Sequence, residues 1–263
     1  MPDQLLHRHD EDGVATLTLN NPASLNALSQ AMLGALESAF TALAADATIR
    51  VVILAGEGRA FCAGHDLKEM QAARTAPDKG ASFYAELFAQ CARVMQMIPA
   101  LPQPVIAQVH GLATAAGCQL AASCDLVTAA DTARFGVIGV NIGLFCSTPM
   151  VALTRKIPPA LAFEMLTTGE FISAARAREA GLVNRVAPQD GLADETLALA
   201  RTIAAKLSAA VKIGKRAFYD QATLPLAEAY ALTGAVMQEN MAWRDTEEGI
   251  AAFLEKRAPD WPR

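Results

Sequence analysis

The stretch from residue 104 to residue 122 constrains the fold more than any other part of the chain. It opens with a short apolar run at residues 104–109, which is typical of a β-strand, and continues as small residues into a predicted helix. Gly111 and Gly117 allow the backbone to approach another backbone or a ligand closely. A helix that begins near Ala115 directs unpaired N–H groups at whatever lies in front of it. Such a helix start suits an oxygen that becomes negative during a reaction, although close packing of helix on strand explains the same residues.

Length and composition limit the classes of protein that fit this chain. The 263 residues are enough for one large domain or for a core with a smaller appendage, and 52% of them are hydrophobic. The net charge of −5, with no basic and aromatic stripe, argues against nucleic acid as a partner. A small anionic ligand stays possible because only the local charge matters for it.

The cysteines favour neither a disulfide framework nor a metal site. The five cysteines are scattered and odd in number, and the pair at residues 118 and 124 has no His nearby in the sequence. A reducing compartment is the natural interpretation, and residues 1–4 resemble neither a signal peptide nor an Arg-rich transit peptide. No apolar run is long enough to span a bilayer. We therefore expect a cytoplasmic protein with no metal, no membrane contact and no permanently bound cofactor.

Hydrophobic periodicity predicts a mixed first part and an all-helical second part of the chain. Strands are predicted at residues 14–19, 51–54, 104–109, 125–129, 134–137 and 183–186. Helices are predicted at residues 30–45, 80–98, 159–168, 173–180, 192–207, 210–220, 225–241 and 246–257. The change near residue 190 places a domain boundary between residues 1–190 and residues 191–263.

Two irregular loops are the expected locations of functional residues. The first, at residues 56–66, is punctuated by glycines and follows a strand that reads as buried on both faces. Asp66 at its end can cap a short helix that begins at Leu67. The second loop occupies residues 139–149, where Pro149 fits the first turn of a helix. Long loops after buried strands often carry function.

Four motifs in the right order resemble the enoyl-CoA hydratase/isomerase (crotonase) family. Residues 61–70 resemble that family's F-x-A-G-x-D-L-x-E-M segment, and residues 110–120 resemble its N-G-x-A-x-G-G-G-x-E-L segment. Residues 19–28 resemble its N-terminal signature and residues 248–257 its C-terminal one. The segments 110–120 and 140–149 resemble one subgroup of the family in particular. The resemblance covers nearly the whole chain.

The resemblance implies both a fold and an assembly. The family fold is a spiral of ββα units followed by a helical region that is used for trimerisation. We therefore expect an α/β protein with a crotonase-like ββα spiral core at residues 1–190, which carries the acyl-CoA site. Residues 191–263 would then be the trimerisation helices of a homotrimer or of a dimer of trimers.

The resemblance also implies an acyl-CoA site, with coenzyme A present only as part of the substrate. The family holds the thioester oxygen between two backbone N–H groups, which map by motif onto His65 and Ala116. Because both donors are backbone groups, side-chain changes at these positions leave the chemistry available. The positions that map onto coenzyme A contacts are Ala63, Gly64, Asp66, Leu67, Lys68, Phe253 and Lys256. A helix cap explains Asp66 equally well, and a solvated charge explains Lys68 and Lys256.

The family's hydration reaction uses two glutamates that share a water, and neither glutamate is present in this chain. Gln119 stands in place of one of them, and Gly139 aligns with the other. An amide can orient a water but cannot take its proton near neutral pH, and glycine contributes no side chain. We therefore expect hydration of a 2-enoyl thioester to be very slow or absent.

Other residues could replace the glutamates, because the loop at residues 139–149 faces the acyl chain in relatives. Ser147 aligns near an aspartate that some relatives use for isomerisation or dehalogenation, but a serine nucleophile needs a base beside it. Cys146 is a second candidate nucleophile, although a plain buried thiol is the commoner outcome. His65 and His110 are the candidate bases, and a backbone hydrogen bond is the commoner outcome for His110.

Three functions stay open at this point. The first is an acyl-CoA lyase or isomerase that uses polar groups other than the glutamates. The second is an acyl-CoA hydrolase or decarboxylase, which needs the two N–H groups but not the glutamate pair. The third is a non-catalytic acyl-CoA binder that keeps the fold and has lost the acid–base groups.

Overall fold

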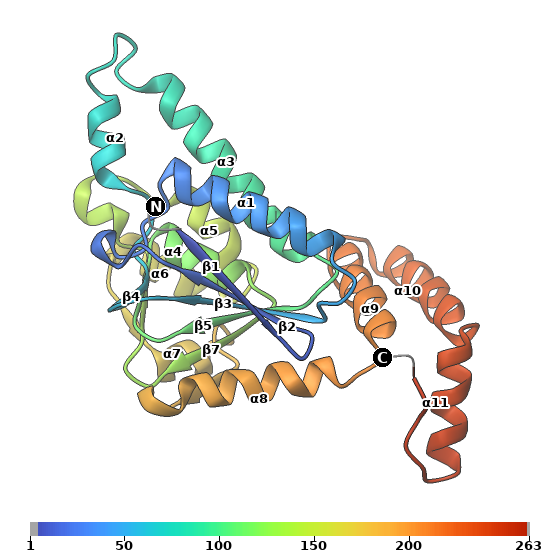
Figure 1. The fold of residues 1–263 in the computed structure, drawn as a ribbon. Helices are drawn as coiled ribbons and strands as arrows, with labels where there is room; N and C mark the ends of the chain where they lie inside the picture. Colours follow the sequence, from blue (N-terminus) through green and yellow to red (C-terminus); the bar gives the residue numbers. More distant parts are fainter. Residues whose placement is uncertain (1–4, 262–263) are drawn as a thin grey trace.

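Two sheets lie at the centre of the molecule (Figure 1), and the computed structural model describes them within residues 5–261. The six-stranded sheet has the order β1-β2-β3-β5-β7-β10, and the four-stranded sheet has the order β4-β6-β8-β9. The strands are β1 (Leu6–Glu11), β2 (Val14–Leu19), β3 (Val51–Gly56), β4 (Ala60–Cys62), β5 (Val105–Val109), β6 (Leu112–Thr114), β7 (Leu126–Ala130), β8 (Arg134–Gly136), β9 (Ile172–Ser173) and β10 (Arg185–Ala187). Residues 1–4, on which the interpretation of the N-terminus rested, lie outside the described residues.

The chain visits the two sheets in turn and so builds a spiral. β3, β5 and β7 are parallel neighbours in the larger sheet. The strands that follow them, β4, β6 and β8, are parallel neighbours in the smaller one. Because each pair of strands is followed by helices, the repeated unit is ββα. The predicted α/β class with a ββα spiral core is therefore confirmed.

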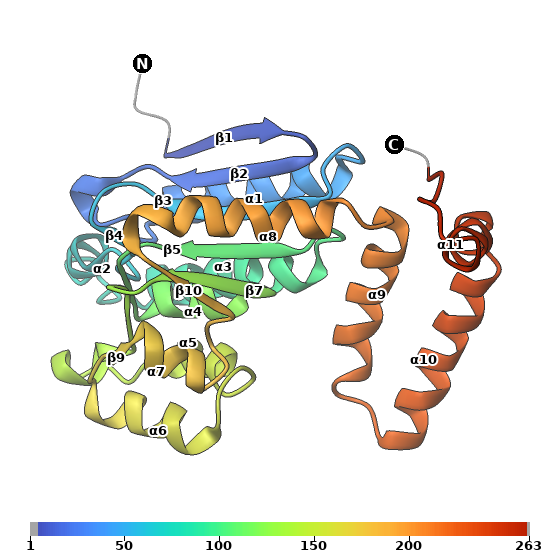
Figure 2. The ribbon, with the colours of Figure 1, turned by 90° about the horizontal axis from the view of Figure 1, so that it is seen from below.

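Helices cover both faces of the larger sheet (Figure 2). The helices are α1 (Gln30–Ala45), α2 (Leu67–Ala73), α3 (Ala81–Ala100), α4 (Ala116–Ser123), α5 (Ser147–Leu153), α6 (Pro159–Thr168), α7 (Ala174–Glu179), α8 (Leu192–Ala204), α9 (Ser208–Gln221), α10 (Leu226–Met241) and α11 (Arg244–Leu254). Short 3-10 turns lie at Pro22–Ser24, Ile138–Ile142 and Gln189–Gly191. α8 covers one face, where Leu199 and Ala204 pack on Val51 and Ile106. The opposite face carries the main core beneath α1, α3 and α4.

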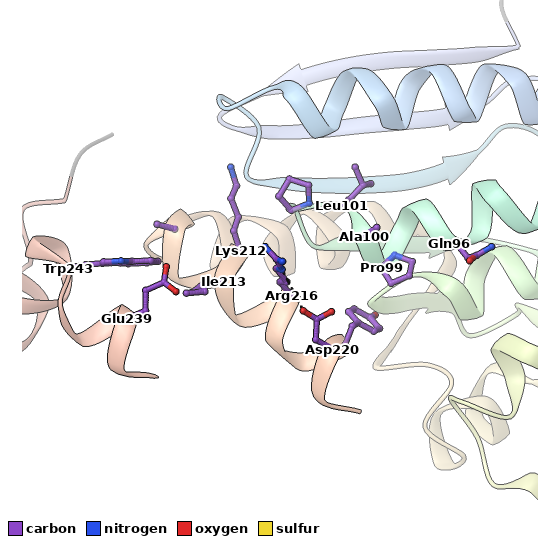
Figure 3. A pocket seen from close by; sticks show the side chains of 13 residues that line it. Gln96, Pro99, Ala100, Leu101, Lys212, Ile213, Arg216, Asp220, Glu239 and Trp243 are labelled. Carbon is purple, nitrogen blue, oxygen red and sulfur yellow. Dashed lines mark ion pairs between the residues drawn. The ribbon is translucent and has the colours of Figure 1, made fainter. Parts of the chain in front are cut away.

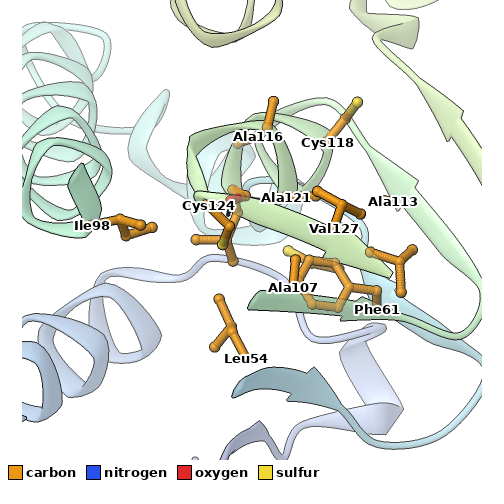
Figure 4. Close-up of a cluster of buried hydrophobic side chains, with 14 of the residues drawn as sticks. Leu54, Phe61, Ile98, Ala107, Ala113, Ala116, Cys118, Ala121, Cys124 and Val127 are labelled. Carbon is orange, nitrogen blue, oxygen red and sulfur yellow. Dashed lines mark hydrogen bonds between the residues drawn. The ribbon is translucent and has the colours of Figure 1, made fainter. Parts of the chain in front are cut away.

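Small side chains set the distance between α4 and the sheets. Leu54 of β3, Ala107 of β5 and Val127 of β7 pack in the main core together with Ala121 of α4 (Figure 4). A Cβ atom at Gly117 would meet the carbonyl group and side chain of Cys62 on β4, so only glycine allows this approach. The small residues at 111–122 therefore pack a helix tightly on strands, as the sequence indicated.

The structure adds strands that the sequence pattern did not show. β1, β4, β6 and β9 were not predicted, and β6 lies inside the predicted turn before α4. β4, β6 and β9 have three residues or fewer, which is too short for a periodic pattern. β1 is an edge strand whose residues are exposed except for Leu6, so it lacks an apolar face.

The C-terminal helices α9, α10 and α11 project from the core as an arm (Figures 1 and 2). α8 packs on the sheet, so the projecting part begins with α9, and the division at residues 190 and 191 stays a prediction. A groove of about 810 Å³ lies between the C-terminal end of α3 and the arm (Figure 3). Its walls include Pro99 and Leu101 on the core side and Lys212, Arg216 and Trp243 on the arm. Among residues 5–261 no helix is long and apolar enough to cross a membrane.

A buried ion pair fastens α9 to the core. Asp125 Oδ2 accepts hydrogen bonds from Lys215 Nζ at 2.7 Å and from the Val105 N–H at 2.6 Å, and its Oδ1 accepts from Tyr219 at 2.7 Å. Lys215 Nζ also donates to the carbonyls of Ile98 at 2.9 Å and Gln103 at 2.8 Å. All three donors of the ammonium group are therefore used, although burial lowers the pKa of Lys215.

Candidate functional site

A cavity of about 310 Å³ lies between α2, α3, the N-terminal end of α4 and the segment 138–149. Its walls are mostly apolar, with Leu67 and Met70 from α2, Phe88 from α3, and Ile138, Leu144 and Phe145 from the segment. The described residues that line it include no Asp, Glu, Lys or Arg. A ligand inside it meets a low-dielectric environment, where the few polar groups act strongly.

Two loops meet at the N-terminal end of α4 and form one wall of the cavity. Gly64 has φ +91°, and a Cβ atom there would lie 2.9 Å from Ala115 Cβ and 3.1 Å from Ala116 N. Only glycine therefore lets the loop before α2 touch the start of α4. The hydrogen bond from the Ala115 N–H to the Gly136 carbonyl, at 2.9 Å, holds the second loop on β8.

Ala115 stores backbone strain at this point. Its φ of 50° and ψ of −122° belong to a region that residues with a Cβ atom rarely adopt. Such a conformation costs about 1–3 kcal/mol and is typical of functional sites. Because of this turn, α4 starts abruptly, and the Ala116 N–H lies in the first turn of the helix, where it has no carbonyl partner within the helix.

His65 and Ala116 both line the cavity. Within residues 5–261 neither N–H has a hydrogen-bond acceptor. The bridge between Leu28 and His65 leaves the His65 N–H unused, because its hydrogen bond runs from the Leu28 N–H to the Gly64 carbonyl. One donor comes from a loop, and the other adds the positive end of a helix. Two such groups beside an apolar cavity can hold an oxygen that becomes negative.

The structure brings most of the predicted site residues to this cavity. Ala63, His65, Leu67, Ala116, Gly139 and Ser147 line it. Asp66 is the N-cap of α2 and accepts from the Lys68 N–H at 2.8 Å, while the Lys68 side chain is exposed. Phe253 and Lys256 lie at the end of α11 on the far side of the molecule, so within one chain they do not reach the cavity (Figure 1).

Gln119 and Gly139 leave the site without a carboxylate for different reasons. Gln119 lies on α4, is 5% exposed, and is not among the residues that line the cavity. A Cβ atom at Gly139 would collide with the Leu144 carbonyl oxygen and lie 2.8 Å from Cys146 Sγ. The space that a glutamate would need at residue 139 is therefore already filled by this chain.

The candidate nucleophiles have no base beside them. Ser147 donates to the Phe145 carbonyl at 3.4 Å, and burial raises the pKa of the Cys146 thiol. His110 Nε2 bonds the Gly58 carbonyl at 2.9 Å, as expected for a structural histidine. Within residues 5–261 no group of His, Cys, Asp and Glu is placed to hold a metal ion.

Three buried polar atoms around the start of α4 lack hydrogen-bond partners among the described residues. They are His65 Nε2, Thr114 Oγ1 and Gln119 Oε1. Buried polar groups are nearly always paired, so three exceptions on the same two segments mark a place built for something other than stability. Sequence reasoning singled out neither Thr114, which stands at a variable position of the 110–120 segment, nor Phe88, which lies in no motif.

The fold and the cavity define a class: an α/β spiral protein with two free backbone N–H groups beside an apolar pocket. The family model described as Enoyl-CoA hydratase/isomerase matches residues 9–263. A mitochondrial enoyl-CoA hydratase domain-containing protein 3 from Homo sapiens is 48% identical over 250 residues, which cover 95% of this chain and 81% of that protein. The counterpart from Xenopus laevis is 47% identical over 251 residues, which cover 95% of this chain and 84% of that protein.

Solved structures agree with these relatives. The crystal structure of an enoyl-CoA hydratase from Mycobacterium smegmatis has a TM-score of 0.95 and 54% identity, and the match covers 98% of this chain and 99% of that one. The crystal structure of human enoyl coenzyme A hydratase domain-containing protein 3 has a TM-score of 0.93 and 46% identity, with 98% and 100% covered. The chain therefore belongs to the enoyl-CoA hydratase/isomerase family and has the crotonase fold.

The expectation of a cytoplasmic protein is wrong. The relatives from Homo sapiens and Xenopus laevis, which match 95% of this chain, are mitochondrial by name. Composition could not have shown this, because free thiols and a negative net charge fit any reducing compartment. Address signals, and not the fold, decide the compartment of a protein.

Proposed function

We propose that this protein binds acyl-CoA thioesters and stabilises negative charge on the thioester oxygen with the N–H groups of His65 and Ala116. The observation that carries the proposal is the pair of unpaired N–H groups in the wall of an apolar cavity. The names of the relatives support coenzyme A thioesters as the ligand class. Coenzyme A is then part of the substrate and not a resident cofactor.

The same cavity argues against the family's hydration reaction in this chain. Its described walls carry no carboxylate that could take a proton from water, because Gln119 is an amide and residue 139 has no space for a side chain. We therefore propose that the enzyme acts on the acyl group through its stabilised thioester oxygen, as an isomerase or lyase without the glutamate pair.

Two of the three alternatives, hydrolysis and decarboxylation, fit the cavity less well. A water held for thioester hydrolysis needs two to four polar partners, and these walls are mostly apolar. A decarboxylase substrate would bring a carboxylate into a site whose described lining has no Lys or Arg to pair with it. A non-catalytic binder would keep the N–H pair but turn over no acyl-CoA.

Two measurements on the purified protein test the proposal. Calorimetric titration with octanoyl-CoA should show saturable binding, and absence of binding would contradict the proposed ligand class. Crotonyl-CoA should keep its enoyl absorbance in the presence of the protein. Hydration at a rate near that of ordinary family hydratases would overturn the claim that the glutamate mechanism is absent.

We further propose that the chain assembles as a homotrimer or a dimer of trimers through its C-terminal helices. Large apolar side chains on the arm are exposed in the single chain, such as Leu226, Met237 and, at 83% exposure, Phe253. Exposed apolar patches of this kind mark interaction surfaces. Light scattering should give three or six times the mass of 27.7 kDa, and a monomer would contradict the assembly.

A further inference from the structure

Two titratable side chains occur among the described residues that line the cavity, namely His65 and Cys146. The Cys146 thiol is buried, and burial raises its pKa, so it is protonated near neutral pH and is a poor base. His65 Nε2 is buried and has no hydrogen-bond partner among residues 5–261. Among the described residues that line the cavity, the His65 imidazole is therefore the one group that can accept a proton at neutral pH.

Resting on the proposed function, we propose that His65 Nε2 removes the Cα proton of the bound acyl thioester and returns a proton to it. The proton moves from Cα to Nε2, and the C–H electron pair forms the double bond of an enolate. The carbonyl π pair moves onto the oxygen that the two N–H groups hold. Reversal returns a proton from the imidazolium to Cα, so the step needs no oxidant or other reactant.

The position of His65 supports this role. Its backbone N–H is one of the two groups proposed to hold the thioester oxygen. The imidazole belongs to the same residue and is therefore attached beside the proposed position of the thioester. The Cα atom is bonded directly to the thioester carbonyl carbon. The C–H bond at Cα is therefore the one that a stabilised thioester oxygen weakens.

The hydrogen bonding of the imidazole favours a lone pair on Nε2. Nδ1 lies 3.4 Å from the Leu28 carbonyl oxygen, which can only accept, so Nδ1 carries the hydrogen in the neutral ring. The Phe88 ring packs edge-on at 5.5 Å between centroids and also lines the cavity. Because Nε2 is shielded from solvent, contact with substrate requires a movement of side chains around the imidazole.

Burial also sets the charge of the imidazole. Desolvation lowers the pKa of His65 below its ordinary 6.5, so the ring is neutral at pH 7 and its lone pair is available to accept a proton. The neighbouring elements add few charges. On α2, Asp66 caps the helix and Glu69 accepts from the Gln30 N–H at 3.1 Å, while the Lys68 side chain is exposed. The segment 138–149 contributes the Cys146 thiol, and α3 contributes Tyr84, which donates to the Met70 carbonyl at 2.8 Å.

Deuterium exchange at Cα tests the proposal without any net reaction. Octanoyl-CoA is incubated with the full-length protein in D₂O, and mass spectrometry counts the deuterium in its acyl chain. We expect the wild type to incorporate deuterium at Cα and His65→Gln to be slower by about 100-fold, which is the usual contribution of a positioned base. His9→Gln, at an exposed histidine of the edge strand β1, is the matched control and should exchange at the wild-type rate.

The outcomes separate this inference from the proposed function. If octanoyl-CoA does not bind the wild type, the proposed function fails. If octanoyl-CoA binds but no deuterium is incorporated, or if His65→Gln exchanges as fast as the wild type, the role of His65 is wrong. The pH profile of the wild type is a second test that needs no variant. The exchange rate should reach half of its maximum below pH 6.5, and a rise only above pH 9 would assign the step to the Cys146 thiol, whose pKa is raised by burial.

Discussion

Two buried polar clusters in this molecule differ in how well their hydrogen bonds are satisfied. Around Asp125, the carboxylate, the Lys215 ammonium and the Tyr219 hydroxyl all have partners between 2.6 and 2.9 Å. Around the start of α4, His65 Nε2 and Gln119 Oε1 have none among the described residues. The first cluster joins the arm to the core, and its charged groups are saturated. Only the side-chain Oε1 of Gln103, whose backbone carbonyl accepts from Lys215, has no partner there among the described residues. The second lies beside a cavity and has unmet capacity, which indicates a binding site.

The largest expected effect is the loss of stability when the saturated cluster is broken. Lys215→Ala leaves the Asp125 carboxylate, whose side chain is only 14% exposed, without its cation, so we expect the free energy of unfolding to fall by about 3 kcal/mol, the lower end of the range for buried pairs. Urea denaturation measures this change. Arg216→Ala on the same helix removes an exposed pair with Asp220 at 3.5 Å and should cost less than about 1 kcal/mol. Equal losses of stability in the two variants would mean that the Asp125 cluster contributes no more to stability than an exposed ion pair does.

The next effect concerns the cavity cluster and should appear in function. Gly64→Ala places a Cβ atom against Ala115 and Ala116 N, so the two N–H groups can no longer converge. Losing one such donor costs about 100- to 1,000-fold in rate in other enzymes, and we expect a loss of that size in Cα exchange on octanoyl-CoA. Gly181→Ala is the matched control, because its φ of +87° is similar and its nearest neighbour is at 3.6 Å. If both variants exchange the Cα hydrogen of octanoyl-CoA for deuterium at the same rate, the contact between the two loops is not required for the reaction.

A smaller effect tests whether the missing glutamates can be restored. Gly139→Glu combined with Gln119→Glu supplies both carboxylates, but the first must displace the Leu144 carbonyl and Cys146. We expect no gain in crotonyl-CoA hydration and a loss of about 1–3 kcal/mol in the free energy of unfolding, as for other overpacked sites. A large gain in hydration would show that the loop at residues 139–149 can move to accommodate the new side chain. It would also show that the site lacks only the two carboxylates needed for hydration.

The smallest effect concerns the strain beside the cavity. Ala115→Gly removes the Cβ atom that disfavours a φ of 50°, so the free energy of unfolding should rise by about 1 kcal/mol after the entropy cost of glycine. Thermal unfolding at fixed pH measures it. A decrease in stability would mean that Ala115 is not strained and that the start of α4 needs another explanation.

The sequence predicted the family, the spiral and the two N–H positions because these depend on local motifs. Gly64, His65 and Ala116 belong to runs whose spacing is visible along the chain. It also predicted that carboxylates are missing at residues 119 and 139. What it could not show depends on contacts between distant residues: the Lys215 pair with Asp125 joins residues 90 positions apart.

The physical reason is the same for the cavity. Phe88 packs against His65 through the approach of α3 to a loop, and Cys146 fills the space at Gly139 through the path of one segment. Neither contact leaves a recognisable pattern in the local sequence. The sequence could offer His65 as a candidate base, but only the packing shows that its Nε2 is unpaired.

The most direct test of the cavity's role is the carbonyl ¹³C resonance of octanoyl-CoA labelled at the thioester carbon. If the N–H groups of His65 and Ala116 bind the thioester oxygen, they polarise the carbonyl group, and the resonance should move downfield when the protein is added. Gly64→Ala should reduce that shift, and Gly181→Ala should keep it. A bound thioester whose carbonyl resonance stays at its position in water would contradict the account.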